Sequence, residues 1–438
     1  MKHHGSVPTL LMALSVFLLG MPAPILAGEE VRLSPLPNPD AGERYRPQVA
    51  WNSQHREYLT VWHNTWPGGE RDVYARRVDH RGQLRSWFAV TVGATDRFQP
   101  DVAYNPADNQ YLVVWTLDVA GDGSRYEIWG KIIPWNAPGT NSEFVIGNVI
   151  GKSSWSPHVV WDSHMSQYMV CWDEVGEASD VAESIGCRAV HRSGVPLSYS
   201  TVTNVDMPHQ SDLTFIPGSA GRYVVVWRGL GSQPGAPQWD IYGQIIDWSV
   251  FPIGSRVPIT DPYPNIVDTR NPTVACDNAE LPQARCHVLW EDLGSSNWDI
   301  AGREFAAFDL SATSPAYLLL WPIPINHNNT APEIVYSGTR DYFVIFYQQT
   351  EGAPGNLYET IRGLRWRELS YVGHSFVVQD AVFWNHEEPA AAAGDDDVFV
   401  VYAGDDGFTR HIYGRTALTI FWGDFEIGNT SRWSATAP

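Results

Sequence analysis

Hydrophobic and polar residues alternate in short runs along most of the chain, and turn residues separate the runs. One stretch reads Pro100-Asp-Val-Ala-Tyr-Asn105, then Tyr111-Leu-Val-Val-Trp115, then Glu127-Ile-Trp-Gly-Lys131. Such β-branched and aromatic runs, separated by Asn, Asp, Gly and Pro, are typical of β-strands joined by tight turns. No segment after the first 27 residues shows a sustained helical period. The pattern therefore predicts an all-β protein with almost no helix.

The same order of runs recurs about every 57 residues. The second run of a copy reads Tyr223-Val-Val-Val-Trp227, for example, and we align Tyr342 to Phe346 of the sixth copy with it. A third run such as Asp240-Ile-Tyr-Gly-Gln244 follows, and a fourth such as Phe88 to Val92. The copies begin near residues 47, 100, 157, 211, 272, 332 and 389, each with a proline except at Ser211. Four antiparallel strands repeated seven times predict a seven-bladed β-propeller over residues 28–418.

The two ends of the repeat region complement each other. The seventh copy has three strands, the last ending near Leu418, and no clear fourth strand before the tail of residues 419–438. Residues 31–36 lie upstream of the first proline and belong to no blade of their own. We expect them to supply the outer strand of blade seven, because that pairing closes the ring and covers an open sheet edge.

The repeat resembles a family of secreted bacterial β-propellers. Their blades read proline-x-valine-alanine, then leucine-valine-valine-tryptophan, then aspartate-isoleucine-tyrosine-glycine, and the likeness extends over residues 31 to 418. The shared residues form the blade framework, so the resemblance implies the architecture and indicates no particular function.

Residues 1–27 have the pattern of an export signal. Lys2 precedes an apolar run from Leu10 to Leu19, and the small residue Ala27 ends the segment. The run is too short to span a bilayer comfortably, and no later apolar stretch reaches about 18 residues. We therefore expect a soluble, monomeric mature chain, extracellular or periplasmic, without membrane insertion.

The charge of the chain excludes one class of partner. The formal net charge is −20, from 29 basic and 49 acidic residues. Binding a nucleic-acid backbone needs clustered lysine and arginine, so we expect no nucleic-acid partner. The acidity is expected to keep an exported protein soluble.

The four cysteines are predicted to form two disulfides, each within one blade. Disulfides are the usual state of cysteines in an exported chain. When the copies are overlaid, Cys276 and Cys286 fall on neighbouring positions of the first two strands, and Cys171 and Cys187 on the second and third. The pairs Cys171–Cys187 and Cys276–Cys286 follow. A metal site is the rival interpretation, but neither a C-x-x-C spacing nor nearby histidine pairs support one.

Candidate functional residues lie where the copies differ. The recurring tryptophans, such as Trp62 and Trp115, are assigned to packing. Loops from the second to the third strand, such as Asp173 to Ser184 and Tyr347 to Leu357, share one face with the connections between blades, and we call it the long-loop face. Long loops on a rigid framework commonly carry binding residues. The aromatic residues expected to bind a ligand there are Trp66, Tyr126, Trp155, Trp239, Trp298, Tyr358 and Trp384. The alternative is that these rings plug the mouth or pack on their own loops.

The sequence contains no catalytic motif that we recognise. There is no nucleophile elbow, and the run from His386 is not the zinc-protease pattern. Glu387 and Glu388 are the only adjacent acidic pair near the expected channel mouth. The acidic loops Asp118–Asp122 and Asp405–Asp406 leave Ca²⁺ open, although solvated turns explain them as well and we expect no cofactor.

These observations lead to two hypotheses about function. The first is a non-catalytic propeller that binds an extracellular glycan or protein through its long-loop face. The alternative is a glycan-cleaving hydrolase or lyase with carboxylates at the central cavity, because such enzymes place their acids in space rather than in a local motif.

Overall fold

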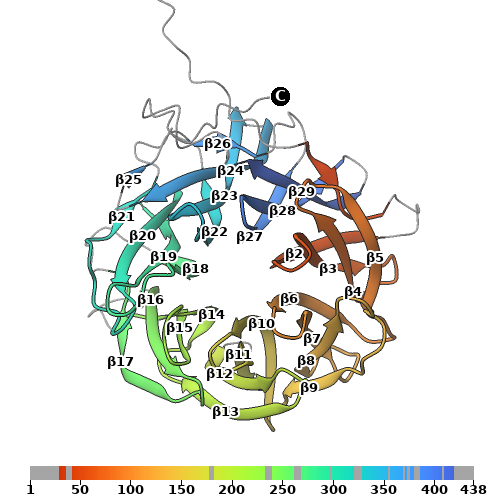
Figure 1. The fold of residues 1–438 in the computed structure, drawn as a ribbon, viewed down its shortest axis with the longest axis horizontal. Helices are drawn as coiled ribbons and strands as arrows, with labels where there is room; N and C mark the ends of the chain where they lie inside the picture. The colour runs from red at the N-terminus through yellow and green to blue at the C-terminus, as the bar shows by residue number, and fades with distance from the viewer. Residues whose placement is uncertain are drawn as a thin grey trace, which may run out of the picture.

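The computed structural model describes residues 29–35, 42–176, 182–231, 239–260, 268–294, 297–319, 328–353, 356–367, 370–371, 375–378, 385–406 and 409–418. Seven antiparallel sheets stand around a central axis, which confirms the predicted seven-bladed, all-β fold (Figure 1). The described residues contain no helix, and so none that is long and apolar enough to cross a membrane.

The strands of each blade follow one another outward from the axis. Blade one contains β2 (Glu43–Asn52), β3 (Glu57–Thr65), β4 (Arg71–Asp79) and β5 (Leu84–Thr91). Blade two contains β6 (Arg97–Asn105), β7 (Gln110–Asp118), β8 (Tyr126–Pro134) and β9 (Phe144–Gly147). Blade three contains β10 (Lys152–Asp162), β11 (Gln167–Gly176), β12 (Ala182–His191) and β13 (Pro196–Thr203). Blade four contains β14 (His209–Phe215), β15 (Arg222–Leu230), β16 (Trp239–Asp247) and β17 (Pro252–Pro258).

The remaining three blades keep this order. Blade five contains β18 (Asp268–Cys276), β19 (Arg285–Leu293), β20 (Trp298–Ala306) and β21 (Tyr317–Leu318). Blade six contains β22 (Asn329–Ser337), β23 (Tyr342–Ala353), β24 (Asn356–Arg367) and β25 (Ser370–Tyr371), with β26 (Phe376–Val377) also paired to β24. Blade seven contains β27 (His386–Ala393), β28 (Asp397–Asp405), β29 (Arg410–Leu418) and the N-terminal β1 (Val31–Arg32).

The N-terminal strand completes blade seven, as the sequence predicted. Val31 lies opposite Gly414, and Arg32 lies opposite Tyr413. The backbone N–H of Leu33 then donates to the Ile412 carbonyl at 2.7 Å, and the Leu33 side chain is fully buried. Hydrogen bonds between the two ends of the chain therefore close the ring.

One aromatic ring per blade fills the same position of the second strand. Trp62, Trp115, Trp172, Trp227, Trp290, Tyr347 and Tyr402 are all fully buried, which supports their assignment to packing. In blade six the position belongs to Tyr347 rather than to Phe346, so the predicted alignment was wrong by one residue. Phe346 pairs with Glu333 there, as Val226 pairs with Asp212 in blade four.

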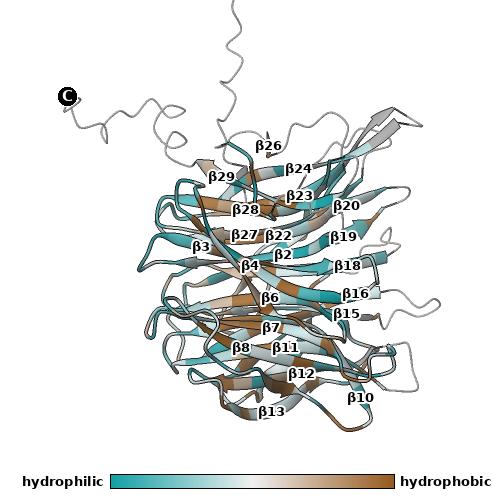
Figure 2. Ribbon diagram, turned by 90° about the vertical axis from the view of Figure 1, so that its right-hand side faces the viewer, coloured by the Kyte–Doolittle hydropathy of each residue, from teal (hydrophilic) through white to brown (hydrophobic). Residues whose placement is uncertain are grey.

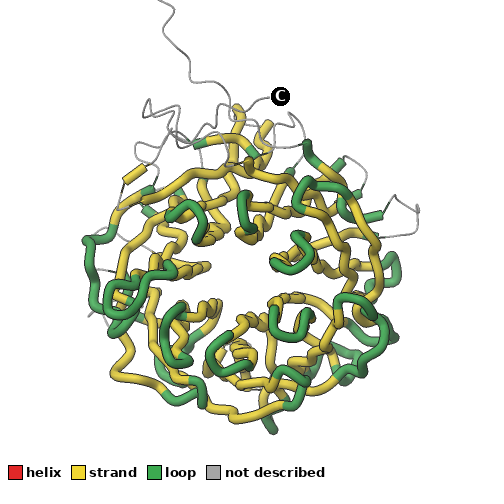
Figure 3. The backbone as a smooth tube through the Cα atoms, in the orientation of Figure 1, coloured by secondary structure: helices red, strands yellow, loops and turns green. Residues whose placement is uncertain are grey.

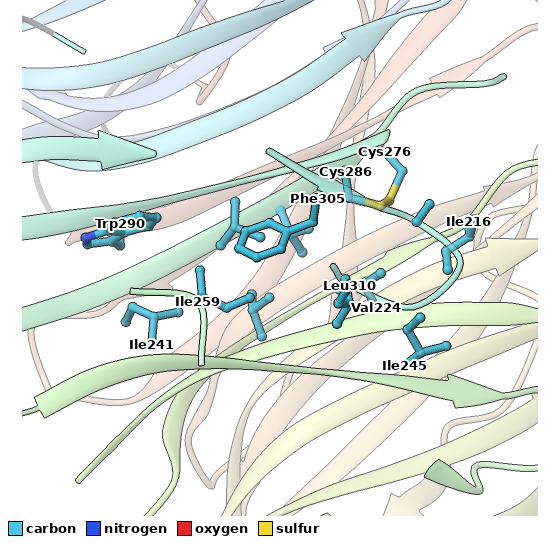
Figure 4. Close-up of a cluster of buried hydrophobic side chains, with 14 of the residues drawn as sticks. Ile216, Val224, Ile241, Ile245, Ile259, Cys276, Cys286, Trp290, Phe305 and Leu310 are labelled. Carbon is cyan, nitrogen blue, oxygen red and sulfur yellow. A yellow bond between two sulfur atoms is a disulfide. The ribbon is translucent and has the colours of Figure 1, made fainter. Parts of the chain in front are cut away.

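Hydrophobic side chains fill the spaces between successive blades, and in Figure 2 the strands carry most of the hydrophobic colour. Figure 4 shows the cluster between blades four and five, with Trp290 at one end and the Cys276–Cys286 disulfide at the other. A second disulfide joins Cys171 of β11 to Cys187 of β12. Both predicted pairings are therefore confirmed.

A β-bulge recurs in the innermost strand of every blade. The residue before the proline, or before Ser211 in blade four, has a φ between 48° and 55°. The pairing with the second strand shifts at this point in all seven blades. We call these residues the bulge ring: Arg46, Gln99, Ser156, Gln210, Asn271, Ala331 and Glu388. Because the innermost strands begin on the long-loop face, the ring surrounds the axis at that face, and Figure 3 shows the innermost strands of the blades standing around the axis.

Candidate functional site

A cavity of about 680 Å³ lies inside the ring of blades. Its lining comes from the innermost strands of all seven blades, so it occupies the central channel. All members of the bulge ring except Gln99 line it on the long-loop side. The next level is the residue two positions further along each strand, and we call this set the channel ring: Gln48, Asp101, His158, Asp212, Thr273, Glu333 and Ala390.

Neighbouring blades hold the bulge ring in place. The backbone N–H of Gln210 donates to Oδ2 of Asp173 in the preceding blade at 2.7 Å. The N–H of Ala331 donates to Oε1 of Glu291 at 2.8 Å in the same way. Equivalent bonds fix Arg46, Ser156 and Asn271. The backbone at the mouth is therefore tied to the blade before it.

Two aspartates of the channel ring bridge pairs of blades. The innermost strand is a sheet edge, so its N–H groups that face the channel need acceptors from outside the sheet. Asp101 accepts the N–H of Val102 in its own blade at 2.7 Å and that of Val159 in blade three at 2.8 Å.

Asp212 repeats this geometry between blades four and five. It accepts the N–H groups of Leu213 and Val274 at 2.7 and 2.9 Å. Glu333 of blade six reaches only the next blade, where it accepts the N–H of Ala391 at 3.4 Å. The channel acids therefore act as acceptors for edge amides.

The channel wall is strongly acidic. Nδ1 of His158 lies 3.4 Å from Oδ1 of Asp212 and 3.9 Å from Oδ2 of Asp101. Burial raises the pKa of Asp101 to about 6, and the charge of Asp212 adds to the increase. Burial raises the pKa of Glu333 well above its usual range, and the charges of Asp212 and Asp101 raise it further. A ligand in the channel therefore meets many acceptor oxygens on the wall of blades two to six.

Sequence reasoning did not identify the channel ring. In the sequence, each member of the channel ring is the variable residue between the proline and the valine of its copy. This residue is Asp101 in one blade and Thr273 in another. The acidic pair that the sequence did single out lies at the mouth, where both residues bind arginines. Glu387 forms a bidentate contact with Arg410 at 3.0 Å, and Glu388 lies 3.1 Å from Arg46.

The structure places the described members of the predicted aromatic set on the long-loop side, half-buried and outside the lining of the cavity. It brings Tyr126 and Trp155 together, with ring centres 5.8 Å apart. Trp66 instead donates its indole N–H to Asp72 at 2.8 Å. Tyr358 lies near the start of β24, and Trp384 falls outside the described residues.

Arginines stack on two of the predicted rings. The guanidinium carbon of Arg228 lies 4.4 Å from the centre of the Trp239 ring, and that of Arg270 lies 3.8 Å from the Trp298 ring. Each arginine also binds a carboxylate at 2.6 Å, Asp268 for Arg228 and Glu291 for Arg270. Each stacked guanidinium therefore covers one face of its ring.

The loops of this face are shorter than the sequence predicted. Residues 347–357 were expected to form a loop, but β23 and β24 continue through them and pair as far as Ala353 opposite Asn356. The expectation was wrong because the polar residues of this segment, such as Gln349 and Thr360, pair across the two strands and extend the sheet.

The two acidic loops are held largely by their own hydrogen bonds. Both oxygens of Asp118 accept backbone N–H groups, from Gly121 at 2.9 Å and Gly123 at 2.8 Å. Oδ2 of Asp406 lies 3.0 Å from Nε2 of His411. In the part of the chain that the structure describes, no three His, Cys, Asp or Glu residues are arranged to hold a metal ion.

Comparison with known proteins shows the fold and no family. No family model and no curated protein sequence matches the chain. A protein of unknown function from Dyadobacter fermentans has 9% identity over 89% of this chain and 98% of its own, with a TM-score of 0.55. The GH93 α-L-arabinofuranosidase of Fusarium graminearum, solved with arabinobiose, has 10% identity over 89% and 97%, with a TM-score of 0.49. The β-propeller domain of the Trilobed protease from Pyrococcus furiosus has 9% identity over 85% and 95%, with a TM-score of 0.48. The first likeness concerns the fold alone, and the other two are too distant to bear on function.

Proposed function

We propose that the protein is an extracellular, non-catalytic propeller that binds a neutral glycan at the channel mouth on the long-loop face. The observation that carries the proposal is the polar cavity on the axis, with its wall of carboxylate, amide and hydroxyl groups. Sugar hydroxyls donate to such acceptors, and aromatic rings near the mouth supply surfaces for stacking.

The charges at the mouth favour a neutral ligand. Arg46, Arg228, Arg270 and Arg410 each already bind a carboxylate. An anionic sugar would therefore have to displace one of these pairs and would also face the acidic channel ring. A neutral sugar meets neither cost.

The hydrogen bonds of the channel aspartates favour binding over cleavage. Hydrolysis of a glycosidic bond commonly needs one carboxyl group as proton donor and a second as base or nucleophile. In Asp101 and Asp212 both carboxylate oxygens already accept backbone N–H groups that hold neighbouring blades together. These two acids therefore serve the ring of blades.

Two features support an extracellular location. The Cys171–Cys187 and Cys276–Cys286 disulfides are stable in oxidising compartments. The first 27 residues also have the pattern of an export signal.

A glycan array with the mature protein, run beside an assay for released reducing ends, tests the proposal. We expect binding of neutral glycans without release of reducing ends. Replacing Trp239 and Trp298 together by alanine should then weaken binding about 30-fold, the loss of a stacking hot spot. Trp87→Ala is the control, because this ring is 49% exposed on the outer strand β5, away from the mouth.

Three results would contradict parts of the proposal. Release of reducing ends would favour the hydrolase. Unchanged binding by the folded double variant would remove the two rings from the site. The absence of binding to any glycan would remove the function itself.

A further inference from the structure

Seven backbone N–H groups form a level of their own in the channel. They belong to the residues that follow the channel ring: Val49, Val102, Val159, Leu213, Val274, Ile334 and Ala391. Each of these residues pairs with the second strand at the same distance from the bulge. Since the N–H groups of Val102 and Val159 point away from the second strand to Asp101, the other five N–H groups point into the channel as well.

An odd number of blades leaves one blade outside the links that join the blades in pairs. Acids occupy the channel ring in blades two, four and six, and each one binds the amide of the following blade. These links join blades two and three, four and five, and six and seven. Blade one belongs to none of these pairs. Its Val49 N–H has Gln48 on its own blade and Ala390 on the preceding blade, and neither is an acid.

Val49 therefore presents a donor that is not used within the described residues. Val49 and Gln48 both line the cavity, and neither the Val49 N–H nor the Gln48 carboxamide has a hydrogen-bond partner among those residues. The N–H of Ile334 is also open, but its own neighbour Glu333 supplies a carboxylate beside it. Only at blade one does a free N–H stand next to a free carboxamide.

The chemistry of this position selects the group that would fill it. A secondary amide accepts hydrogen bonds at its oxygen and donates one at its nitrogen. Its oxygen can take the Val49 N–H, and its N–H can donate to Oε1 of Gln48. A ligand carboxylate could also accept from Val49, but Asp101, Asp212 and Glu333 would repel it.

We propose that the open position of blade one binds the acetamido group of an N-acetylated sugar, so that the glycan taken by the channel consists of 2-acetamido sugars. This inference rests on the proposed function and names its substrate class. The acids of blades two, four and six then accept hydrogen bonds from the sugar hydroxyls around the rest of the channel wall.

Isothermal titration with two matched trisaccharides tests the inference. Chitotriose carries an acetamido group on each ring, and cellotriose has the same linkage with hydroxyl groups instead. Two hydrogen bonds to neutral groups correspond to a preference of about tenfold or more. We expect the wild-type protein to bind chitotriose at least about tenfold more tightly than cellotriose.

Ala390→Asp should abolish this preference. By analogy with Asp101 and Asp212, the new carboxylate would accept the N–H groups of Ala391 and Val49 and thereby occupy the donor. The variant adds a link between blades seven and one but also buries a carboxylate, so its melting temperature is measured beside its binding. The control is Thr273→Asp, which adds the same charge to the same ring but lies beside Ile334. It should keep the preference for chitotriose.

The outcomes separate the two levels of the proposal. Equal binding of both trisaccharides by the wild type contradicts the acetamido site. Loss of the preference in Thr273→Asp as well as in Ala390→Asp contradicts it too. Both results are compatible with glycan binding by the channel. Binding of no glycan at all overturns both levels. If Ala390→Asp does not fold, Gln48→Leu replaces it, and a retained preference in that variant contradicts the inference.

Discussion

Leu33→Ala tests the closure of the ring at a single side chain. Leu33 follows the two-residue strand β1 and is fully buried among residues of blades one and seven, including Val49, Phe399 and Ile412. One of its methyl groups packs over Gly414, where an added Cβ would lie 3.0 Å away. Truncation to alanine therefore removes apolar contacts on both sides of the junction between the two chain ends.

The expected cost lies in the upper part of the range for such truncations. A buried leucine replaced by alanine commonly loses about 2–5 kcal/mol, and the loss grows with the cavity that remains. Gly414 has no side chain that can move into the space, so we expect about 3–5 kcal/mol. An unfolding entropy of about 2.1 cal/mol/K for each of roughly 390 residues converts this cost into a fall in Tm of about 4–6 °C.

Differential scanning calorimetry measures the effect, with Val31→Ala as the matched control. Val31 lies on the same terminal segment but is only half-buried, so its truncation should cost about 1 kcal/mol and lower Tm by about 1 °C. Removing residues 28–38 altogether should expose the edge of β29 and cause aggregation. If Leu33→Ala lowers Tm no more than Val31→Ala does, the terminal segment does not hold the ring closed, and the reasoning is refuted.

Three further predictions concern stability. Trp115→Ala should cost about 3–5 kcal/mol by denaturant unfolding, because the ring is fully buried, and a cost below about 1 kcal/mol would contradict its packing role. Asp292 and Asp299 lie opposite each other, and burial raises the pKa of each to about 6. The folded state therefore binds protons more tightly than the unfolded chain, so stability falls as the pH rises from about 4 to 6. Asp292→Asn should raise Tm at pH 7 and change it little at pH 4, and the reverse order would refute the sign. Replacing Cys276 and Cys286 by serine should cost about 2–3 kcal/mol relative to the oxidised wild type by denaturant unfolding, and reduction of the wild type, which also opens Cys171–Cys187, should cost more.

Repetition made the fold predictable from the sequence. Each strand run appears in several copies, so a weak signal in one blade is supported by the others, and counting strands led to the N-terminal closing segment. The method failed where similarity of residue type misled the alignment. In blade six Tyr342 was matched with Tyr223, whereas Phe343 occupies that position because it pairs with Tyr336 as Tyr223 pairs with Phe215.

The channel site could not be predicted for the same reason. Each blade contributes one residue to the channel ring, and the residues differ between blades, so they look like random variation between copies. Asp101 and Val159 are 58 positions apart, yet they form a hydrogen bond. Only the packing of neighbouring blades brings such residues together. The bulges were hidden as well, because a positive φ is most readily recognised from glycine, and none of the seven bulge residues is a glycine.

The seven residues of the bulge ring share one backbone conformation but carry different side chains. A left-handed backbone costs a non-glycine residue on the order of 1 kcal/mol, yet these seven positions carry arginine, glutamine, serine, asparagine, alanine and glutamate. Side chains of the preceding blade hold the backbone at five of them, and three of these side chains, those of Gln99, Gln210 and Glu388, belong to the ring itself. All seven blades therefore share one backbone shape at the mouth, whereas the side chains at it differ from blade to blade. The side chains of Ser156, Asn271 and Ala331 neither donate nor accept these bonds. A library randomised at such ring positions would vary the recognition of a ligand at the mouth and leave the fold intact.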